Sequence, residues 1–254
     1  PEHARFAPLL NKTDTLPRLA HARLIAGQLA RLGQSALIGA VGGTDAPIRE
    51  RWGRCVAVVL AAGGSERFGK PKQLALVDGE AMVLRAVRTA LQSGVHQELV
   101  VTGAYDKSVA ELLATHGYHE SARPDHNAPF VLQIVHNQRW QEGQATSVHA
   151  ALGTLSSKIE AAIFLPVDQP HLPVSLLRRL QRAWRNGSDL AAPAVNGQIR
   201  GAPALFARQF WPDLLAVRGD IGGRDILRQN RDRVAAVPVD ASTLIDINRV
   251  SDLR

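Results

Sequence analysis

The sequence predicts an α/β protein built on a doubly wound, mostly parallel sheet. From Cys55 onward, apolar runs alternate with amphipathic stretches, which is the rhythm of strands and helices in such a sheet. The strongest apolar runs are continuous, as expected of strands that are buried on both faces. With 45% hydrophobic and 21% charged residues, the chain of 254 residues has the composition of a globular protein and excludes a disordered or fibrous one.

The individual elements follow from this alternation. CVAVVLA (55–61) predicts a buried strand, and residues 81–93 have helical spacing. Further strands are predicted over 98–103, 130–135, 161–167, 190–195, 202–206, 234–239 and 244–247. Further helices are predicted over 106–116, which Asp106 can cap, and over 144–155, 173–184, 207–216 and 222–229. The Asn-Gly pair at 196–197 predicts a tight hairpin, and residues 116–129 form a polar loop.

Residues 1–54 are predicted to be a separate piece. They contain a helix over 18–32, a short strand over 35–41, a linker rich in Gly, Pro and Asp, and a charged turn. The sequence starts at Pro1 and its only methionine is Met82, so we expect a fragment of a longer chain. We therefore divide it into a partial N-terminal segment, 1–54, and a complete domain, 55–254.

Cysteine usage and hydropathy indicate the cytoplasm. Cys55 is the only cysteine, so no internal disulfide can form. No run approaches the ~20 apolar residues of a membrane helix, and the start lacks the layout of a signal peptide. The formal net charge of +7 suggests a polyanionic partner. Because residues 1–54 hold eight Lys/Arg against four Asp/Glu, most of the excess lies there, and a small polyphosphate explains the rest without nucleic acid.

A glycine-rich loop with basic residues follows the first strand, in LAAGGSERFGKPKQL (60–74). Its glycines let backbone N–H groups approach phosphate oxygens, and Ser65 adds a hydroxyl. Arg67 and Lys72 supply the cations expected around a triphosphate. The pattern is neither a P-loop nor a G-x-G-x-x-G fingerprint, which argues against a P-loop NTPase and a dinucleotide oxidoreductase. The alternative is a glycine-rich turn with incidental charges.

This loop resembles the signature L-A-A-G-x-S-x-R-x-G-x-P-K-x-L of the MobA-like nucleotidyltransferases, most closely the molybdenum cofactor cytidylyltransferases. The resemblance spans about 55–254 and continues in WQEGQATSVHAAL (140–152), PVDQP (166–170), RGAPALF (200–206) and GDIGGRDIL (220–227). It implies a Rossmann-like fold of the nucleotide-diphospho-sugar transferase type. It also implies Mg²⁺-dependent transfer of CMP from CTP to molybdopterin with release of pyrophosphate, and contact with a molybdenum hydroxylase that takes up the product.

The resemblance assigns roles to matched residues. Catalysis by positioning and charge neutralisation would involve Lys72, Arg67 and Asp168. The nucleotide would be bound by the loop and by the start of the helix that opens at 144, through Leu60, Ala61, Ala62, Gly63, Gly64, Ser65, Gly143, Thr146 and Ser147. The acceptor wall would comprise Arg200, Gly201, Pro203, Asp220 and Arg224. Asp220 and Arg224 would form an ordering ion pair or contact the pterin phosphate, whereas Thr146 and Ser147 could be an ordinary helix cap.

The expected metal site lies at the carboxyl edge of the sheet. Asp168 follows a buried strand, so its carboxylate would project into the crevice there, where Mg²⁺ prefers one or two carboxylates plus phosphates and water. In LIDINRVSDL (244–253), Asn248 replaces the family's second aspartate; its amide oxygen can still ligate Mg²⁺, and Asp246 is the reserve ligand. The alternatives are a capping or turn role for Asp168 and a strand-end turn for Asp246.

The family associates Leu-Ala-Ala-Gly with cytidylyl transfer and Leu-Ala-Gly-Gly with guanylyl transfer. Residues 60–63 are Leu-Ala-Ala-Gly, so CTP is expected rather than GTP. A methyl at Ala62 would narrow the base pocket against a purine, although one methyl decides only ~1 to 3 kcal/mol. The alternatives are a guanylyl- or sugar-phosphate nucleotidyltransferase on the same scaffold, or a non-catalytic molybdopterin-binding chaperone.

Other conspicuous residues are interpreted as structural. The histidines at 116, 119 and 126 belong to a polar loop, and the arginines at 178, 179, 182 and 185 to a solvated helix face. Trp140, Trp184 and Trp211 are expected in the core or in subunit contacts. Asn-Lys-Thr-Asp (11–14) resembles the guanine-reading motif near the end of the selenium-dependent hydroxylase accessory domain. Because the chain has no P-loop, we expect this segment to bind no GTP by itself.

Overall fold

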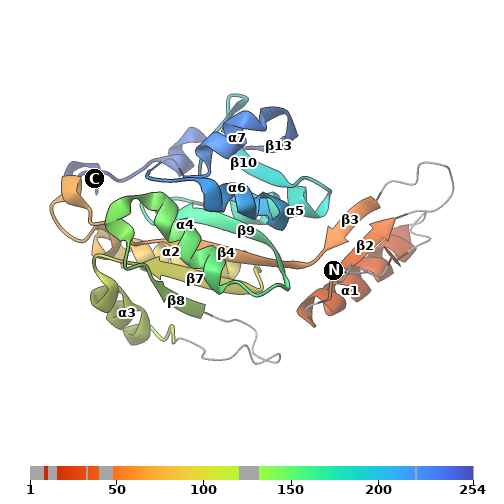
Figure 1. Cartoon of the computed structure of the whole chain (residues 1–254). Helices are drawn as coiled ribbons and strands as arrows, with labels where there is room; N and C mark the ends of the chain where they lie inside the picture. Colours follow the sequence, from red (N-terminus) through yellow and green to blue (C-terminus); the bar gives the residue numbers. More distant parts are fainter. Residues whose placement is uncertain are drawn as a thin grey trace.

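The computed structural model describes residues 9–10, 16–32, 34–39, 48–119, 132–220 and 222–253. The Asn-Lys-Thr-Asp motif, most of the polar loop with His126, and the start of the strand predicted at 130 lie outside these ranges. Within them the chain forms a large mixed sheet flanked by helices and a smaller N-terminal lobe, which lies at the right in Figure 1. No helix of the described residues is long and apolar enough to cross a membrane.

The doubly wound, mostly parallel sheet is confirmed. In the described residues it has eight strands in the order β11-β10-β12-β9-β4-β7-β8, with β13 paired to β10. β4 pairs in parallel with both β7 and β9, whereas β12 is antiparallel to β9 and β10. The bounds are β4 (Arg54–Leu60), β7 (Gln97–Thr102), β8 (Leu132–His136), β9 (Ile159–Pro166), β10 (Leu190–Val195), β11 (Gln198–Ile199), β12 (Ala204–Ala207) and β13 (Val234–Pro238).

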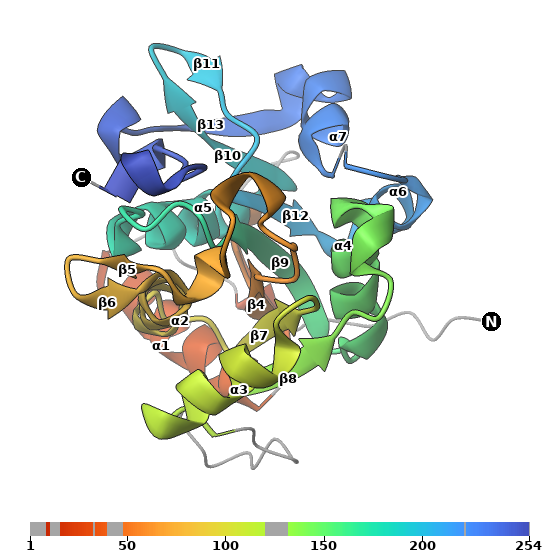
Figure 2. The ribbon, with the colours of Figure 1, turned by 90° about the vertical axis from the view of Figure 1, so that its left-hand side faces the viewer.

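Helices cover both faces of this sheet, as Figure 2 shows along the strands. β4 is buried on both sides, because Cys55, Ala57 and Val59 pack into one apolar core and Val56 and Val58 into the other. The first core is closed by α2 (Met82–Gln92), α3 (Asp106–Thr115) and α5 (Val174–Arg185). The second is closed by α4 (Gln144–Thr154), α6 (Trp211–Ala216) and α7 (Arg224–Gln229). Between β4 and α2 lies a short hairpin of β5 (Leu76–Val77) and β6 (Glu80–Ala81).

Three local predictions are corrected by the structure. Residues 244–247 are not a strand: a 3₁₀ turn ends at Leu244, and the chain then passes Asp168, whose carbonyl accepts a hydrogen bond from the N–H of Ile247 at 2.8 Å. Asp106 does not cap α3 but is its first residue, after Tyr105. The charged turn before Gly53 is instead a strand, β3 (Ile48–Trp52).

The N-terminal lobe has its own three-stranded sheet. β1 (Leu9–Leu10) and β3 flank β2 (Ala36–Gly39), and α1 (Leu16–Arg31) packs on the sheet. The lobe is joined to the amino ends of β4 and β9: the Ser35 hydroxyl donates to Glu160, and Arg54 donates to two carbonyls at the end of α1. It therefore lies at the end of the sheet opposite to the loops that follow β4 and β9 (Figure 1).

Candidate nucleotide-binding and metal site

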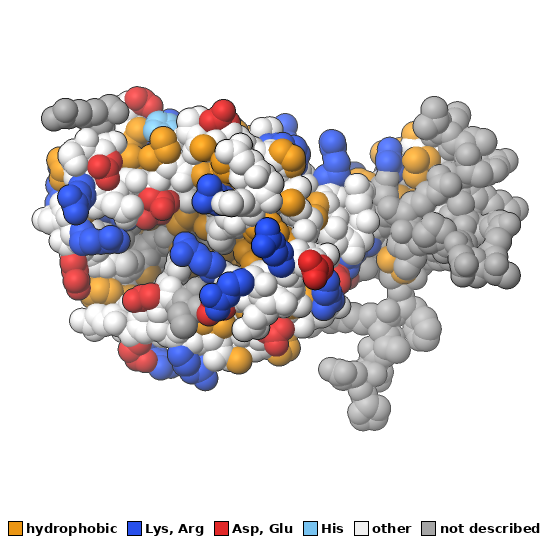
Figure 3. Space-filling model, turned by 90° about the horizontal axis from the view of Figure 1, so that it is seen from above, with side chains coloured by type: hydrophobic (Ala, Val, Ile, Leu, Met, Phe, Trp, Pro, Cys, Tyr) orange, Lys and Arg blue, Asp and Glu red, His pale blue; other side chains and the backbone are white. Residues whose placement is uncertain are grey.

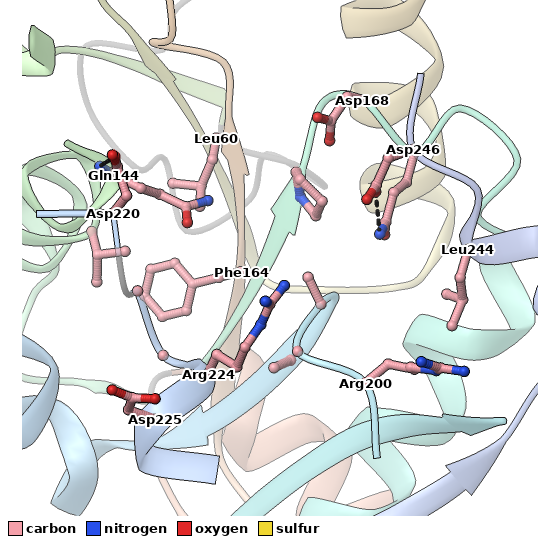
Figure 4. A pocket seen from close by; sticks show the side chains of 18 of the residues that line it. Leu60, Gln144, Phe164, Asp168, Arg200, Asp220, Arg224, Asp225, Leu244 and Asp246 are labelled. Atoms are coloured by element: carbon pink, nitrogen blue, oxygen red, sulfur yellow. Dashed lines mark hydrogen bonds between the residues drawn. The ribbon is translucent and has the colours of Figure 1, made fainter. Parts of the chain in front are cut away.

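A cavity of about 880 Å³ opens at the carboxyl ends of β4 and β9. Leu60 and Pro166, the last residues of these strands, line it together with Phe164 and Asp168. Its size falls within the range of small-molecule sites. Figure 4 shows Asp168 and Asp246 on one side, Gln144 and Asp220 on the other, and Arg224 pointing between them. This is the edge of the sheet where the sequence places its functional residues.

The loop after β4 has the properties expected of a phosphate-binding loop. The backbone N–H groups of residues 63–67 donate to no other described part of the protein. Arg67, in a 3₁₀ turn (Glu66–Phe68), is exposed and lines the cavity. Unpaired N–H groups beside a free guanidinium form an anion-binding surface.

Gln73 holds this loop in shape, and sequence reasoning missed it. Its side chain is 1% exposed, and its amide nitrogen donates to the carbonyls of Ala61 (2.8 Å) and Gly63 (2.7 Å). Ser65 has φ +57°. Its hydroxyl accepts a hydrogen bond from the N–H of Lys72 at 3.2 Å and donates one to the side-chain Oε1 of Gln73 at 3.3 Å. The Ser65 hydroxyl, expected on the nucleotide, is thus used within the loop. The only sequence signal for Gln73 is its position inside the signature.

Lys72 and Asp168 meet across the cavity edge. The Nζ of Lys72 lies 2.7 Å from the Oδ2 of Asp168, and the side chains are only 15% and 22% exposed. Lys72 comes from a 3₁₀ turn (Lys72–Leu74) after β4, and Asp168 comes directly after β9. Because β4 and β9 are parallel neighbours, their following loops bring these two residues together. The structure thus brings together two residues that the sequence assigned to one site from distant motifs, and it adds an ion pair between them that was not predicted.

Asp246 and Asn248 line the same side of the cavity as Asp168. Burial raises the pKa of Asp246, and the Asp168 carboxylate raises it further, opposed by a hydrogen bond from Gln169 at 2.9 Å and by the charges of Lys72 and Arg224. A carboxyl whose ionisation is disfavoured by burial and by a neighbouring carboxylate, with an amide oxygen nearby, suits a divalent cation whose other ligands are phosphates and water. The described residues contain no group of three or more His, Cys, Asp or Glu that could hold a metal alone.

The start of α4 is built differently from the expectation. The Thr146 and Ser147 hydroxyls are buried and accept hydrogen bonds from Asn137 at 2.8 and 3.0 Å. The first N–H groups of the helix are also occupied, Gln144 by the Asp220 carboxylate and Ala145 by the Gly219 carbonyl. Gln144 and Val148 line the cavity, whereas Gly143, Thr146 and Ser147 do not. Gly143, Thr146 and Ser147 therefore lie behind the residues of α4 that line the cavity.

Gly143 is required by close packing at this wall. Its φ of +107° suits glycine, and a Cβ there would lie 2.4 Å from the Gly219 carbonyl carbon. The segment after Gly219 is held by Asp220, which caps α4, so the expected Asp220–Arg224 ion pair is not formed. Arg224 points into the cavity instead (Figure 4). Both residues still line the cavity.

The acceptor side of the cavity is basic. Arg200 and Gly201 line it, whereas Pro203 is buried beside it. A Cβ on Gly201 would lie 2.9 Å from the Nε of Arg224, so glycine lets the arginine approach the chain. Arg200 and Arg224 make no hydrogen bond or ion pair through their guanidinium groups with any residue that the structure describes. Their charges are available to a ligand.

Ala62 does not face the cavity as expected. It is 4% exposed, and its carbonyl accepts from the N–H of Ala104 at 3.0 Å. An added Cβ on Gly103 would lie 2.9 Å from the Ala62 methyl and 2.8 Å from the Cβ of Trp140. The methyl is therefore packed against Gly103, and the physical ground given for excluding a purine is not supported. Trp184 and Trp211 are core residues, as predicted.

A doubly wound sheet, a loop of unpaired N–H groups after its first strand, and a lysine–carboxylate cluster beside a large cavity define a nucleotide-binding α/β protein. The chain belongs to the family of the MobA-like NTP transferase domain, whose model matches residues 57–234. The resemblance seen in the sequence is thereby confirmed at the level of the family.

Two proteins that are similar in sequence to this chain have names that describe different activities. Nicotine blue oxidoreductase of Paenarthrobacter nicotinovorans is 31% identical over 84% of this chain and 98% of its own. A molybdenum cofactor guanylyltransferase of Sinorhizobium fredii is 27% identical over 66% of this chain and 67% of its own.

Among solved structures, Rv0371c of Mycobacterium tuberculosis H37Rv has the same fold, with a TM-score of 0.62 and 24% identity over 79% of this chain and 95% of its own. A second structure of that protein is a manganese complex, with a TM-score of 0.55 and 21% identity over 74% of this chain and 89% of its own.

Proposed function

We propose that the protein transfers CMP from CTP to molybdopterin, releasing pyrophosphate, in the maturation of a cofactor that a molybdenum hydroxylase takes up. The observation that carries this proposal is the Lys72–Asp168 ion pair of 2.7 Å beside a loop of unpaired N–H groups. Such a combination binds and neutralises phosphates. The guanylyltransferase among the relatives supports an acceptor of the molybdenum cofactor class.

The reaction is an in-line displacement at phosphorus. An oxygen of the acceptor's terminal phosphate forms a bond to the α-phosphorus of the triphosphate, and the bond from that phosphorus to the bridging oxygen of the β-phosphate breaks. The electron pair leaves with pyrophosphate. Because the attacking phosphate is already ionised, no protein base or nucleophile is required. The protein contributes by position and charge: the loop N–H groups and Arg67 bind the phosphates, and Lys72 neutralises developing charge.

Mg²⁺ fits the acidic side of the cavity. Asp168 and Asp246 would hold it with carboxylate oxygens. Asn248 would add its amide oxygen, because the Asn248 side chain forms no hydrogen bond with any other described residue. When bound, the cation supplies charge neutralisation to the triphosphate. The manganese complex of Rv0371c supports a divalent cation, and the oxygen-rich donor set favours Mg²⁺.

The choice of CTP rests on Leu-Ala-Ala-Gly at 60–63. GTP is the alternative because of the guanylyltransferase among the relatives. A second candidate function, an oxidoreductase reaction on nicotine blue, comes from the name of the relative with 31% identity. The Lys72–Asp168 pair suits the binding of phosphates and of a divalent cation, and it has no role in an oxidoreductase reaction. We therefore place the transferase first.

The decisive experiment combines purified protein, molybdopterin and Mg²⁺ with CTP, GTP, ATP or UTP in turn, and follows pyrophosphate. We expect turnover with CTP to exceed turnover with GTP at least tenfold in kcat/KM, because a base-reading site discriminates by roughly that much or more. Equal turnover would contradict the base choice. If a sugar phosphate is a better acceptor than molybdopterin, it becomes the proposed acceptor. A change in the absorbance of nicotine blue upon reaction with the protein would favour the oxidoreductase.

The variant Asp168→Asn tests catalysis. It keeps the shape of the side chain but removes the charge that binds Lys72, and we expect pyrophosphate release to fall by about 10²-fold or more. Glu111→Gln, on the exposed side of α3, is the matched control and retains full activity. If Asp168→Asn releases pyrophosphate at the normal rate, Asp168 has no catalytic role. If the unaltered protein binds molybdopterin but releases no pyrophosphate with any triphosphate, the protein is a carrier rather than a transferase.

A further inference from the structure

A second hollow, of about 330 Å³, adjoins the acceptor side of the main cavity. Arg200, Gly201 and Arg224 line both spaces, so the two are continuous along these residues. The hollow lies beside β11 and α7, and Figure 3 shows Lys and Arg side chains grouped over the part of this face where α7 lies in Figure 1. We name it the arginine hollow after four of its lining residues, Arg200, Arg224, Arg228 and Arg231.

The positive charge of the arginine hollow is largely uncompensated. Arg228 is paired with Asp225 at 3.1 Å. The guanidinium groups of Arg200, Arg224 and Arg231 have no acidic or carbonyl partner in the part of the chain that the structure describes. Many arginines elsewhere in the described structure are bonded to the fold; Arg51, for example, donates to both a carbonyl and a carboxylate. Three unpaired guanidinium groups around one space predict an anionic ligand.

The walls of the arginine hollow are partly apolar. Ile199 of β11 and Leu227 of α7 line it, and Leu227 is 2% exposed. A planar guanidinium can stack on an aromatic face as well as bond an anion. A space of this volume lies at the small end of the range of ligand pockets and has room for one ring system. The chemistry therefore fits a planar ring that carries negative charge.

We infer that the arginine hollow binds the anionic ring end of the acceptor, remote from the phosphate that attacks CTP. This inference rests on the proposed function and deepens it by giving the acceptor a second anchoring point outside the main cavity. In molybdopterin the negative charge apart from the phosphate is that of the dithiolene on the ring system, because the pterin itself is uncharged near neutral pH, so the dithiolene is the group that the arginine hollow would bind. Arg231 is the residue that belongs to the arginine hollow alone and has no partner in the described structure, so it reports on this site selectively.

Kinetics test the inference in the complete chain. Arg231→Ala raises the KM for molybdopterin about tenfold, the effect of one lost charge-assisted hydrogen bond, and Arg231→Glu raises it further. Both variants leave the KM for CTP unchanged, and Arg231→Lys recovers part of the loss. Arg182→Ala, which removes an exposed arginine on α5, changes neither KM. An unchanged KM for molybdopterin in both Arg231→Ala and Arg231→Glu overturns the inference while leaving the proposed function intact.

Direct binding separates this inference from the transfer reaction. The fluorescent anion pterin-6-carboxylate is titrated with the protein in the absence of nucleotide, and its anisotropy is followed. Binding that weakens about tenfold in Arg231→Ala and is unchanged in Arg182→Ala supports the arginine hollow, even if no nucleotide is transferred to molybdopterin. No binding at millimolar protein, or binding that is equal in all variants, overturns it.

Discussion

The two ends of the parallel strands β4, β7 and β9 carry different kinds of polar group. At their carboxyl ends, Arg67 and Arg224 face a cavity without a partner in the described structure, and Lys72 is bonded only to Asp168. At their amino ends, polar groups are paired with the N-terminal lobe or are held neutral. His96, just before β7, accepts a hydrogen bond from the N–H of Cys55 at 3.3 Å, and its pKa is lowered to about 4 by burial and by the charges of Arg185 and Arg54.

This difference separates function from stability along one sheet. Charges that are left unpaired at the carboxyl ends contribute little to folding and are available to a ligand. Ser35, Arg54 and His96 at the amino ends form their hydrogen bonds within the protein, so these groups stabilise the fold. Substitutions at the first end should change kinetics, and substitutions at the second should change the free energy of unfolding.

The largest effect is expected for Lys72→Ala. The substitution removes the cation at 2.7 Å from Asp168 and should lower kcat/KM for transfer by about 10² to 10³, the usual cost of losing one electrostatic stabiliser. Because both side chains are largely buried, the substitution leaves the Asp168 carboxylate without its partner, and the free energy of unfolding should also fall, by about 1 to 3 kcal/mol. Pyrophosphate release and urea unfolding measure the two quantities. Lys70→Ala, in the same loop but exposed, is the control; equal activity of the two variants would refute a role for the Lys72 charge.

At the opposite end, Arg51→Ala should destabilise the fold without changing kinetics. The Nε of Arg51 donates to the Trp184 carbonyl and its Nη1 to Asp189, both at 2.8 Å. Loss of these bonds should lower the free energy of unfolding by about 1 to 3 kcal/mol. Urea unfolding at neutral pH gives this value, with Lys107→Ala on exposed α3 as a control. A fall in kcat/KM at temperatures where the variant is fully folded would show that the lobe acts on the cavity.

His96 predicts a smaller, pH-dependent effect. Because its pKa is about 4 in the folded protein and about 6.5 when exposed, the unfolded chain binds the additional proton as the pH falls between these values. Stability is therefore lost on acidification, by about 1 kcal/mol between pH 7 and pH 5.5. Unfolding curves at several pH values should show this slope, and His96→Gln should remove it. An unchanged slope in the variant would assign the acid sensitivity to other groups.

The sequence predicted the main sheet well where burial is complete on both faces. β4 and β9 were placed within two residues because their apolar runs are continuous. β3 was missed because its sequence, IRERW, is charged, and its strand form depends on pairing with β2 and on contact between Trp52 and the Arg185 guanidinium at 4.3 Å. The false strand at 244–247 lacks strand alternation, because Ile245 is exposed whereas Ile247, which would lie on the same face of a strand, is buried, and the segment pairs with no strand in the described residues.

For the candidate site, charged residues that are proposed to meet a ligand were easier to select from the sequence than the residues that hold the loops in place. Lys72, Asp168 and Arg67 were found because their charges stand in recognisable loops. Gln73 and Asn137 were not, because a buried amide has no periodicity and its partners are known only after folding. The hydroxyls of Thr146 and Ser147 were assigned to the nucleotide for the same reason, since their bonds to Asn137 are tertiary contacts.

The smallest effect is expected for Ala62→Gly. This variant tests whether a buried residue at the carboxyl end of β4 affects only stability or also the choice of nucleotide. Ala62 stands in the signature at the carboxyl end of β4, yet its methyl is buried against Gly103. Its removal should lower the free energy of unfolding by about 1 kcal/mol and should shift the ratio of kcat/KM for CTP to that for GTP by less than tenfold. Pyrophosphate release with each nucleotide measures the ratio.

Gly103→Ala probes the same contact from the other side. The added methyl would lie 2.6 Å from the Ala62 carbonyl oxygen, which is backbone and cannot turn away, so the loop after β4 must move. Because that loop is proposed to bind phosphates rather than the base, kcat/KM should fall for CTP and GTP by the same factor. The outcome that would contradict this view is a change of more than a hundredfold in the ratio of kcat/KM for CTP to that for GTP in Ala62→Gly. The Ala62 methyl would then contact the base, and the carboxyl end of β4 would select the nucleotide through packed side chains as well as through its unpaired charges.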